Sequence, residues 1–386
     1  FRTEPRYIRA SPSLHACVCA RMFLLATALF CAAAAELPPL YYRYASFAVD
    51  DPNEAARFFS RYTGAKVISS DQFLIDATPA AQVVGVRLPF QGKFSDVYFQ
   101  NDTSLPAGDM SLASFARKIA TTHSMAQDDW DWWQDWHLAF SVDDLDAVAL
   151  RLMKDDVPFV SRGSLYFAIP RTGLIIQVLG DATVYWKEPF LFCRETSEEV
   201  TAKMKPYTLN VTDLGSAPDL PLPEFVPSHQ SLAASDAQAN ARWMEAYLNL
   251  TFFYPFTRPN ETHAYAGGTC ARIEWMYAAD RYQFHFIEQR VKREGNLRIA
   301  AHEDYLRRLH GNLTQVDQYM LFRAALSTPD VGAYAANFAK HGIPTLLSDG
   351  DDGVKRLLVT PPNGYTIELF EDASHRPRVE KSPRQW

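Results

Sequence analysis

One short pattern occurs four times along the chain, and it limits the fold more than any other feature. Each copy is a strand-like run, then one or two aspartates, then an amphipathic helix-like run. The copies are YASFAVDDPNEAARFFSRYTG from Tyr44, HLAFSVDDLDAVALRLMKDDVPF from His137, HQSLAASDAQANARWMEAYLNL from His229 and RAALSTPDVGAYAANFAKHGIP from Arg323. Seven residues after each starting residue stands an aspartate: Asp51, Asp144, Asp236 and Asp330. Because an aspartate there can cap the following helix, the sequence predicts four strand–helix units.

Alternation along each first strand separates two faces. One face is apolar, as with Phe47 and Val49 or Leu138 and Phe140, and we expect it to pack under the helix. The other face carries one large polar residue followed by two small ones, and its large members are Tyr44, His137, His229 and Arg323. The large side chain projects and the small ones leave room, so this face is expected to form the floor of a ligand cleft.

Each copy also ends in a strand with a polar residue inside it. PRTGLIIQVLG from Pro170 and PPNGYTIELFED from Pro361 share a proline turn, a glycine and a strand, and they place Gln177 and Glu368 equivalently. RYQFHFIEQ and SDVYFQND place His285 and Tyr98 at the matching positions. Two hairpin-like strands precede each last strand. The chain is therefore predicted to be α+β, with four βαβββ modules at about 41–103, 136–182, 228–290 and 318–373.

A proline-rich stretch without periodicity, GSAPDLPLPEFVP over 215–227, separates two halves. We expect a leader over 1–35, a first domain over 37–190, a linker over 205–227, a second domain over 228–373 and a tail over 374–386. The pairing of modules stays open: the first can close on the second and the third on the fourth, or the halves can swap between subunits.

The compartment is suggested by two features. MFLLATALFCAAAAE, from Met22, has a short apolar run and a small-residue end, which is typical of a signal peptide or part of an organelle transit peptide. Five of the ten asparagines stand in N-x-T, namely Asn101, Asn210, Asn249, Asn260 and Asn312. So many sequons favour a glycoprotein of the secretory pathway, secreted or in the endomembrane lumen.

The net charge limits the classes of binding partner, and the cysteine count limits the disulfides. Residues 1–35 hold four arginines and one glutamate, so without them the net charge falls from −7 to −10. An acidic chain without a basic stripe argues against nucleic acid and, once the leader is removed, against a membrane as partner. Cys193 and Cys270 remain, either as one disulfide or as two buried thiols. No G-x-x-x-x-G-K motif is present, so no nucleotide cofactor is expected.

These tandem βαβββ modules, with polar residues opening the first strand and inside the last, resemble the vicinal oxygen chelate superfamily. That superfamily includes glyoxalase I, bleomycin and fosfomycin resistance proteins, and extradiol dioxygenases. The resemblance covers about Tyr41 to Asp372. It implies two tandem glyoxalase-like domains, each a curved sheet that holds a divalent metal. The metal would chelate neighbouring oxygens of a small substrate, stabilising an enediolate or activating dioxygen.

Carried over by position, the resemblance gives each half four site residues. They are Tyr44, Tyr98, His137 and Gln177 in the first half, and His229, His285, Arg323 and Glu368 in the second. It implies a zinc, nickel, manganese or iron ion held by His229, His285 and Glu368, with Glu368 or His285 also moving a proton. Arg323 would bind an acidic substrate, and Tyr44, Tyr98, His137 and Gln177 would line the binding sites.

Three functions stay open on the sequence. The first is a metal-dependent lyase, isomerase or dioxygenase that acts in the second domain on a small vicinal-oxygen substrate. The second is a metal-free protein that binds a small molecule in a degenerate site, which Arg323, Tyr44 and Gln177 favour because they replace good ligands. The third is a scaffold whose clefts are filled by side chains. The substrate and the oligomeric state are not predicted.

Overall fold

The structure is a computed structural model that describes residues 37–49, 51–75, 82–90, 93–101, 137–157, 159–161, 164–169, 174–180, 221–252, 263–264, 270–289, 323–350 and 353–372. The expected leader, Cys193, the tail from residue 374 and most of the predicted linker lie outside these residues.

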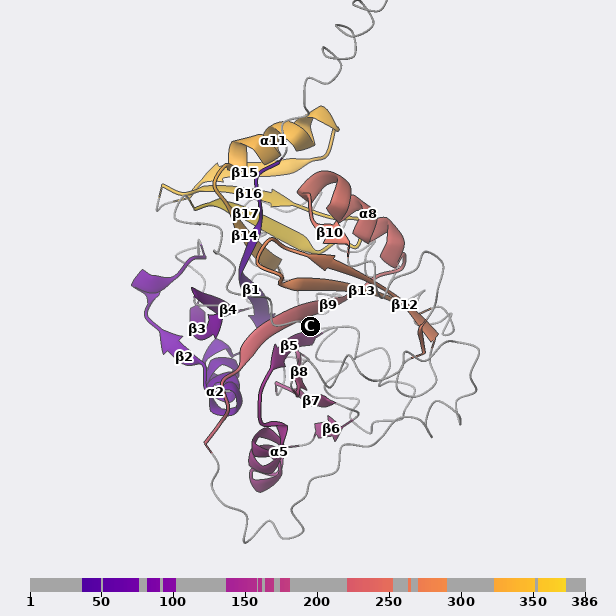
Figure 1. Ribbon diagram of the computed structural model, residues 1–386. Coiled ribbons are helices and arrows are strands. Elements are labelled where there is room, and N and C mark those ends of the chain that lie inside the picture. The colour runs from indigo at the N-terminus through magenta and orange to yellow at the C-terminus, as the bar shows by residue number, and fades with distance from the viewer. Residues whose placement is uncertain are drawn as a thin grey trace, which may run out of the picture. The chain divides into compact units, whose positions relative to one another are not determined.

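Each predicted module is present as a strand, a helix and three further strands (Figure 1). Module 1 consists of β1 (Tyr41–Val49), α2 (Pro52–Thr63), β2 (Lys66–Ile68), β3 (Val83–Phe90) and β4 (Lys93–Asn101), with the 3-10 turn η1 (Ser70–Gln72) before β3. Module 2 consists of β5 (His137–Ser141), α5 (Leu145–Lys154), β6 (Phe159–Ser161), β7 (Ser164–Ala168) and β8 (Ile175–Leu179).

Module 3 consists of β9 (Val226–Ala233), α8 (Ala237–Leu248), β10 (Thr251–Phe252), β12 (Cys270–Tyr277) and β13 (Gln283–Gln289), with the short β11 (His263–Ala264) paired to β12. Module 4 consists of β14 (Arg323–Thr328), α11 (Val331–Lys340), β15 (Thr345–Asp349), β16 (Lys355–Val359) and β17 (Thr366–Glu371). The prediction of an α+β chain with four βαβββ modules is confirmed.

All four helices begin at the predicted aspartates. The carboxylates of Asp51, Asp144, Asp236 and Asp330 accept a hydrogen bond from the backbone N–H three residues on, at 2.9, 3.0, 2.8 and 3.0 Å. Each bond satisfies one of the N–H groups that a helix start leaves without a partner. The caps therefore fix where each first strand ends and its helix begins.

The modules combine in pairs to form two sheets. Sheet A has the strand order β15-β16-β17-β14-β1-β4-β3-β2 and thus joins modules 4 and 1. Sheet B has the order β10-β12-β13-β9-β5-β8-β7-β6 and joins modules 3 and 2. In both sheets the two first strands meet antiparallel, β1 with β14 and β5 with β9. Each sheet therefore takes one module from each half of the chain, which differs from the division into domains at 37–190 and 228–373.

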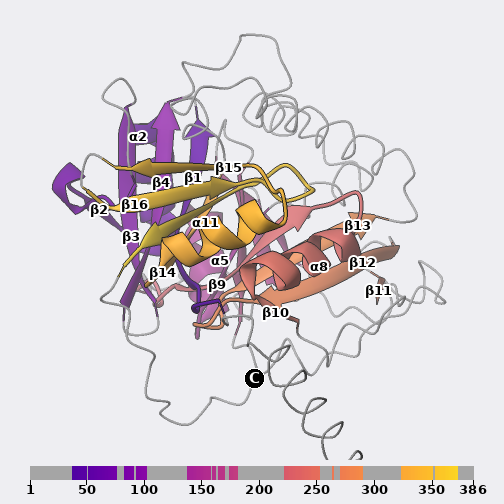
Figure 2. The same cartoon turned by 90° about the horizontal axis from the view of Figure 1, so that it is seen from above.

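The helices make the contacts between modules of the same half. Between α2 and α5, the Arg61 guanidinium holds the Asp155 carboxylate through two hydrogen bonds of 2.9 and 2.7 Å. Between α8 and α11, the rings of Trp243 and Phe338 stack with centroids 6.0 Å apart, and the two helices lie side by side in Figures 1 and 2. Each module thus contacts one neighbour through its sheet and another through its helix.

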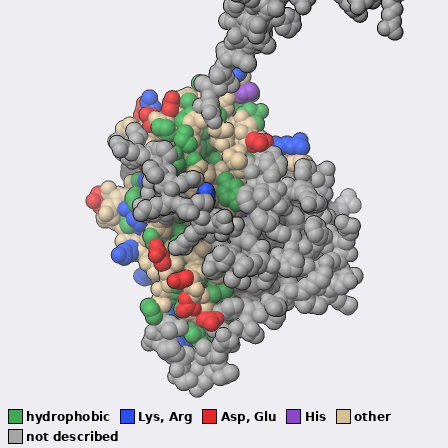
Figure 3. Space-filling model, in the orientation of Figure 1, with side chains coloured by type: hydrophobic (Ala, Val, Ile, Leu, Met, Phe, Trp, Pro, Cys, Tyr) green, Lys and Arg blue, Asp and Glu red, His purple; other side chains and the backbone are tan. Residues whose placement is uncertain are grey.

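Helix α2 packs against the apolar side chains of a last strand, β4, and of a first strand, β5. The ring of Phe59 in α2 lies 6.0 Å from that of Phe99 and 5.7 Å from that of Phe140, both edge to face. Among the described residues, no helix is long and apolar enough to cross a membrane. The face drawn in Figure 3 carries acidic and basic side chains interspersed.

Candidate functional site

The strand register places the predicted site residues on one face of each sheet. In every module the polar residue of the last strand pairs with the small residue two places after the large polar residue of the first strand. The four pairs are Ser46 with Tyr98, Ala139 with Gln177, Ser231 with His285 and Ala325 with Glu368. Paired residues of neighbouring strands point to the same face. This confirms the register predicted for all four last strands, Tyr98 included.

Because the sheets pair module 1 with module 4 and module 2 with module 3, the eight residues form two sets. Tyr44, Tyr98, Arg323 and Glu368 lie together on sheet A, and we call them the sheet A site. His137, Gln177, His229 and His285 lie together on sheet B, and we call them the histidine site. The ligand set implied by the resemblance, His229, His285 and Glu368, is not assembled, because Glu368 belongs to the other sheet.

In the sheet A site, the Glu368 carboxylate is fully buried, and both of its oxygens interact with other side chains of the protein. Oε2 accepts a hydrogen bond from the Tyr44 hydroxyl at 2.7 Å and lies 2.9 Å from Nε of Arg323. Oε1 accepts from Nη1 of Arg356 at 2.8 Å. Burial and the Glu368 carboxylate raise the pKa of Tyr44, so its phenol keeps its proton. This carboxylate is committed to an ion-pair network.

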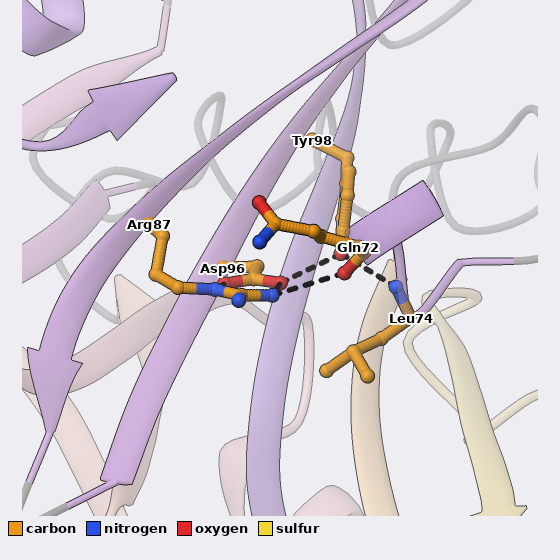
Figure 4. A network of polar contacts seen from close by, with 5 residues as sticks. All are labelled: Gln72, Leu74, Arg87, Asp96 and Tyr98. Atoms are coloured by element: carbon orange, nitrogen blue, oxygen red, sulfur yellow. Dashed lines mark hydrogen bonds and ion pairs between the residues drawn. The ribbon is translucent and has the colours of Figure 1, made fainter. Parts of the chain in front are cut away.

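The chain itself covers the sheet A site with the segment 72–75. Its backbone is held by three side chains: Arg87 donates to the Gln72 carbonyl at 3.0 Å, Arg356 donates to the Leu74 carbonyl at 2.9 Å, and the Leu74 N–H donates to the Tyr98 hydroxyl at 2.8 Å. Figure 4 shows how Tyr98 and Arg87 meet at Asp96, whose carboxylate accepts from both.

Apolar contacts complete this cover. Phe73, Leu74 and Ile75 pack on a cluster that includes Tyr44, Tyr98 and Phe370. The side chains of the sheet A site are accordingly 0% exposed. On sheet A the cleft expected from the sequence is therefore filled by side chains.

The histidine site has a different character. The Nε2 atoms of His137 and His229 lie 3.0 Å apart, and the rings of His229 and His285 stack with centroids 3.9 Å apart. Nε2 of His285 donates to Oε1 of Gln283 at 2.8 Å, since an amide oxygen only accepts. The three histidines are 5%, 4% and 8% exposed, so, unlike the sheet A residues, they keep some accessible surface.

Burial sets the charge state of these rings. Desolvation, with the neighbouring histidines His285 and His137, lowers the pKa of His229 well below 6.5. Desolvation and His137 likewise lower the pKa of His285. Near neutral pH both imidazoles are therefore uncharged, which is the form that binds a metal ion or accepts a proton.

The fourth member, Gln177, presents an oxygen. Its amide nitrogen donates to the Tyr166 hydroxyl at 2.6 Å and to the Ser164 hydroxyl at 3.1 Å. Its oxygen, Oε1, is buried and has no hydrogen-bond partner within the described part of the chain. Oγ of Ser231, which pairs in register with both His137 and His285, is likewise buried without such a partner. A buried polar atom of this kind can be satisfied by a water, an ion or a ligand.

The residues of the two sheets fit a divalent metal unequally. The sheet A site does not fit, because a guanidinium cannot coordinate, the Tyr44 phenol stays protonated and Glu368 is already paired. The histidine site offers two facing imidazole nitrogens and an amide oxygen without a partner, so its donors fit. Among the described residues, however, no three His, Cys, Asp or Glu side chains converge on one metal position. The Gln177 amide oxygen is a candidate third donor on this face.

Sequence reasoning missed three residues. Arg356 of β16 pairs with the carboxylate of Glu368, and Ser164 and Tyr166 of β7 hold Gln177. A signal was present in each strand: in KRLLV an arginine stands directly before three apolar residues, and SLYFA alternates polar and apolar residues. Both strands are middle strands of their modules, where the repeat pattern singles out no position.

The predicted glycosylation sites are partly described. Asn249 is exposed at the C-terminal end of α8 and Asn101 is half-buried at the end of β4. Asn210, Asn260 and Asn312 lie outside the described residues, as does Cys193.

Comparison with known proteins gave structural matches alone. No family model and no curated protein matches the sequence. Among solved structures, glyoxalase I from Zea mays is similar over 86% of this chain and 92% of its own, with 11% identity and a TM-score of 0.45. The cppA protein from Streptococcus pneumoniae is similar over 86% and 99%, with 10% identity and a TM-score of 0.39. A manganese-bound mutant of a fosfomycin resistance protein from Listeria monocytogenes covers 38% of this chain and 95% of its own, with 15% identity and a TM-score of 0.23.

The strand topology itself identifies the fold. Four βαβββ modules join two and two through antiparallel first strands, and each pair gathers the polar residues of its first and last strands on one face. The chain has the vicinal oxygen chelate fold. The four modules and the polar face are those that the sequence resemblance implied, whereas the pairing of module 1 with module 4 and of module 2 with module 3 was not predicted from the sequence. A fold of this kind supports many functions, so the activity has to be argued from the histidine site.

Proposed function

We propose that the histidine site is the working site of this protein and that it binds a divalent metal together with a small molecule carrying neighbouring oxygens. The observation that carries the proposal is the 3.0 Å separation of the His137 and His229 Nε2 atoms. Two nitrogens that bind one metal ion at about 2.1 Å lie about 3.0 to 3.4 Å apart in octahedral or tetrahedral geometry. Sheet A then has a structural role only.

Each residue would have a separate task. His137 and His229 would hold the ion through Nε2, and Gln177 would add its amide oxygen. A bound divalent ion supplies a Lewis acid that polarises oxygens of the ligand. His285, uncharged and stacked on His229, is the base that can take a proton from the ligand. Such a site supports isomerase, lyase or dioxygenase chemistry, as expected from the resemblance.

A metal assay tests this proposal. Purified full-length protein, His137→Ala, His229→Ala and Tyr44→Phe would each be incubated with zinc, nickel, manganese or iron(II), passed over a desalting column and analysed for bound metal. We expect about one ion per chain in the wild type and in Tyr44→Phe, whose change lies on sheet A, and none in the histidine variants. Metal that survives in both histidine variants, or is lost in Tyr44→Phe, would contradict the assignment.

One observation favours a second candidate, metal-free binding of a small molecule. A separation of 3.0 Å between two imidazole nitrogens also suits an N–H···N hydrogen bond. In that case the wild type would retain no metal under any of these conditions. A polar ligand would instead meet Oε1 of Gln177 and Oγ of Ser231, two buried atoms of the histidine site's face that have no hydrogen-bond partner among the described residues.

We also propose that the chain acts in the secretory pathway as a glycoprotein, on the strength of its five sequons and its leader-like segment. The exposed position of Asn249 is compatible with a glycan. Expression of the full chain in a eukaryotic cell, followed by glycosidase treatment, should lower its apparent mass. An unchanged mass would contradict this proposal.

A further inference from the structure

Gln177 is held at one end only, and the two residues that hold it have no other role in the proposed function. We infer that Ser164 and Tyr166 of β7 are positioning residues, which orient the Gln177 amide so that its oxygen serves as the third donor of the histidine site. This inference rests on the proposed function and adds the residues that determine which end of the amide meets the metal.

Two hydrogen bonds hold the Gln177 amide in the orientation that the structure shows. The amide nitrogen of Gln177 has two N–H groups, and the two hydroxyls, at 2.6 and 3.1 Å, use both of them. Turning the amide over would bring its oxygen to these hydroxyls and leave two N–H donors where Oε1 now lies. An N–H group cannot coordinate a cation, so the orientation decides whether Gln177 can bind a metal at all.

The strand register explains why β7 supplies both residues. Tyr166 pairs with Gln177, and Ser164 is two residues away on the same face, so both hydroxyls come from the strand next to β8. The ring of Tyr166 also meets that of His137 edge to face, with centroids 5.9 Å apart. Tyr166 therefore contacts two of the proposed ligands, and its position links the amide to the imidazole.

Burying Oε1 of Gln177 without a hydrogen-bond partner destabilises the folded protein unless a cation or a ligand binds beside it. Gln177 is 2% exposed, and a buried acceptor without a partner costs about 1–3 kcal/mol. Turning the amide over would not remove that cost, because the two hydroxyls can also donate to the amide oxygen but two N–H donors would then take the place of Oε1. An oxygen kept in this state suits a cation, or a donor group of a ligand, placed beside it.

Cobalt(II) provides a spectroscopic test, because its visible absorption reports the donor set. Cobalt would be titrated into full-length wild type, Ser164→Ala, Tyr166→Phe, Gln177→Leu, the two combinations with Gln177→Leu, and Tyr44→Phe as the control on sheet A. We expect Ser164→Ala and Tyr166→Phe to shift the bands toward those of Gln177→Leu. Removing such a supporting hydrogen bond weakens metal binding about ten- to a hundred-fold.

The variants combined with Gln177→Leu distinguish an effect that acts through the Gln177 amide from a general loss of structure. If the two hydroxyls act through the amide, Tyr166→Phe and Ser164→Ala should weaken binding no further once Gln177 is leucine. Wild-type bands in both single variants, or full additivity with Gln177→Leu, would overturn this inference while leaving the metal site in place. A wild type that binds no cobalt would overturn the proposed function and this inference together.

Discussion

Glu368 shows how completely a residue's role depends on its neighbours. As a carboxylate inside the last strand, it looks like a metal ligand in the sequence. In the structure it accepts from Tyr44 of β1 and from Arg356 of β16 and lies against Arg323 of β14. Its charge therefore stabilises two buried arginines and joins modules 1 and 4.

Replacing this carboxylate should damage stability and leave metal binding intact. Glu368→Ala would leave Arg323 and Arg356 buried without their anion, which destabilises proteins by about 3–5 kcal/mol. Urea unfolding should show the loss, and Glu371→Ala, on the same strand but partly exposed, should show little of it. If Glu368→Ala instead lost its metal with little change in stability, Glu368 would be a ligand as the resemblance implied.

The buried histidines predict how the metal-free protein responds to acid. The pKa values of His229 and His285 lie well below 6.5 in the folded protein. Below about pH 6.5 the unfolded chain takes up protons at these positions that the folded chain does not, so stability is present above that pH and is lost as the pH falls. Each group contributes at most about 1.4 kcal/mol per pH unit.

Thermal unfolding in the presence of a chelator would measure this dependence. The midpoint should fall as the pH is lowered from about 7.5 to about 5, and the slope should be smaller in His285→Gln because one of the two groups is gone. A midpoint that rises with acid, or an unchanged slope in the variant, would contradict the uncharged state of these rings.

At the scale of the element, the helix caps can be tested one at a time. Asp330→Ala removes the acceptor for the Ala333 N–H at the start of α11. The change should cost about 1 kcal/mol in unfolding free energy, whereas Asp330→Asn, which can still cap, should cost little. Equal losses in the two variants would show that the charge, and not the cap, stabilises this helix start.

The elements were predictable from the sequence because local chemistry determines them. The caps at Asp51 and its three equivalents and the register of Gln177 and Glu368 follow from short-range patterns. The pairing of modules does not follow, because all four first strands have the same polar and small face. The pattern of the first strands alone therefore does not select the partner of β1. The predicted metal set failed for that reason: it mixed residues of two sheets.

At the scale of the whole molecule, each of the two sheets contains strands from both halves of the chain. Sheet A needs β1 and β14, and sheet B needs β5 and β9, so each half lacks half of both sheets. We predict that the halves 37–205 and 221–373, expressed alone, do not form the native sheets, and that they associate when expressed together. Co-purification and the metal content of the reconstituted pair would check this. Two independently folded halves, each a stable monomer, would contradict it.

The pairing of module 2 with module 3, and of module 1 with module 4, also determines the order in which the two sheets can form during synthesis. Modules 2 and 3 are neighbours in the chain, so sheet B can close as soon as β13 has emerged. Module 1 is made first, yet the edge of β1 stays unpaired until β14 follows almost 300 residues later. An open strand edge is prone to wrong pairing during that interval. We therefore expect module 1 to be the most dependent of the four modules on chaperones, and a chain truncated before β14 to leave module 1 without its sheet partner.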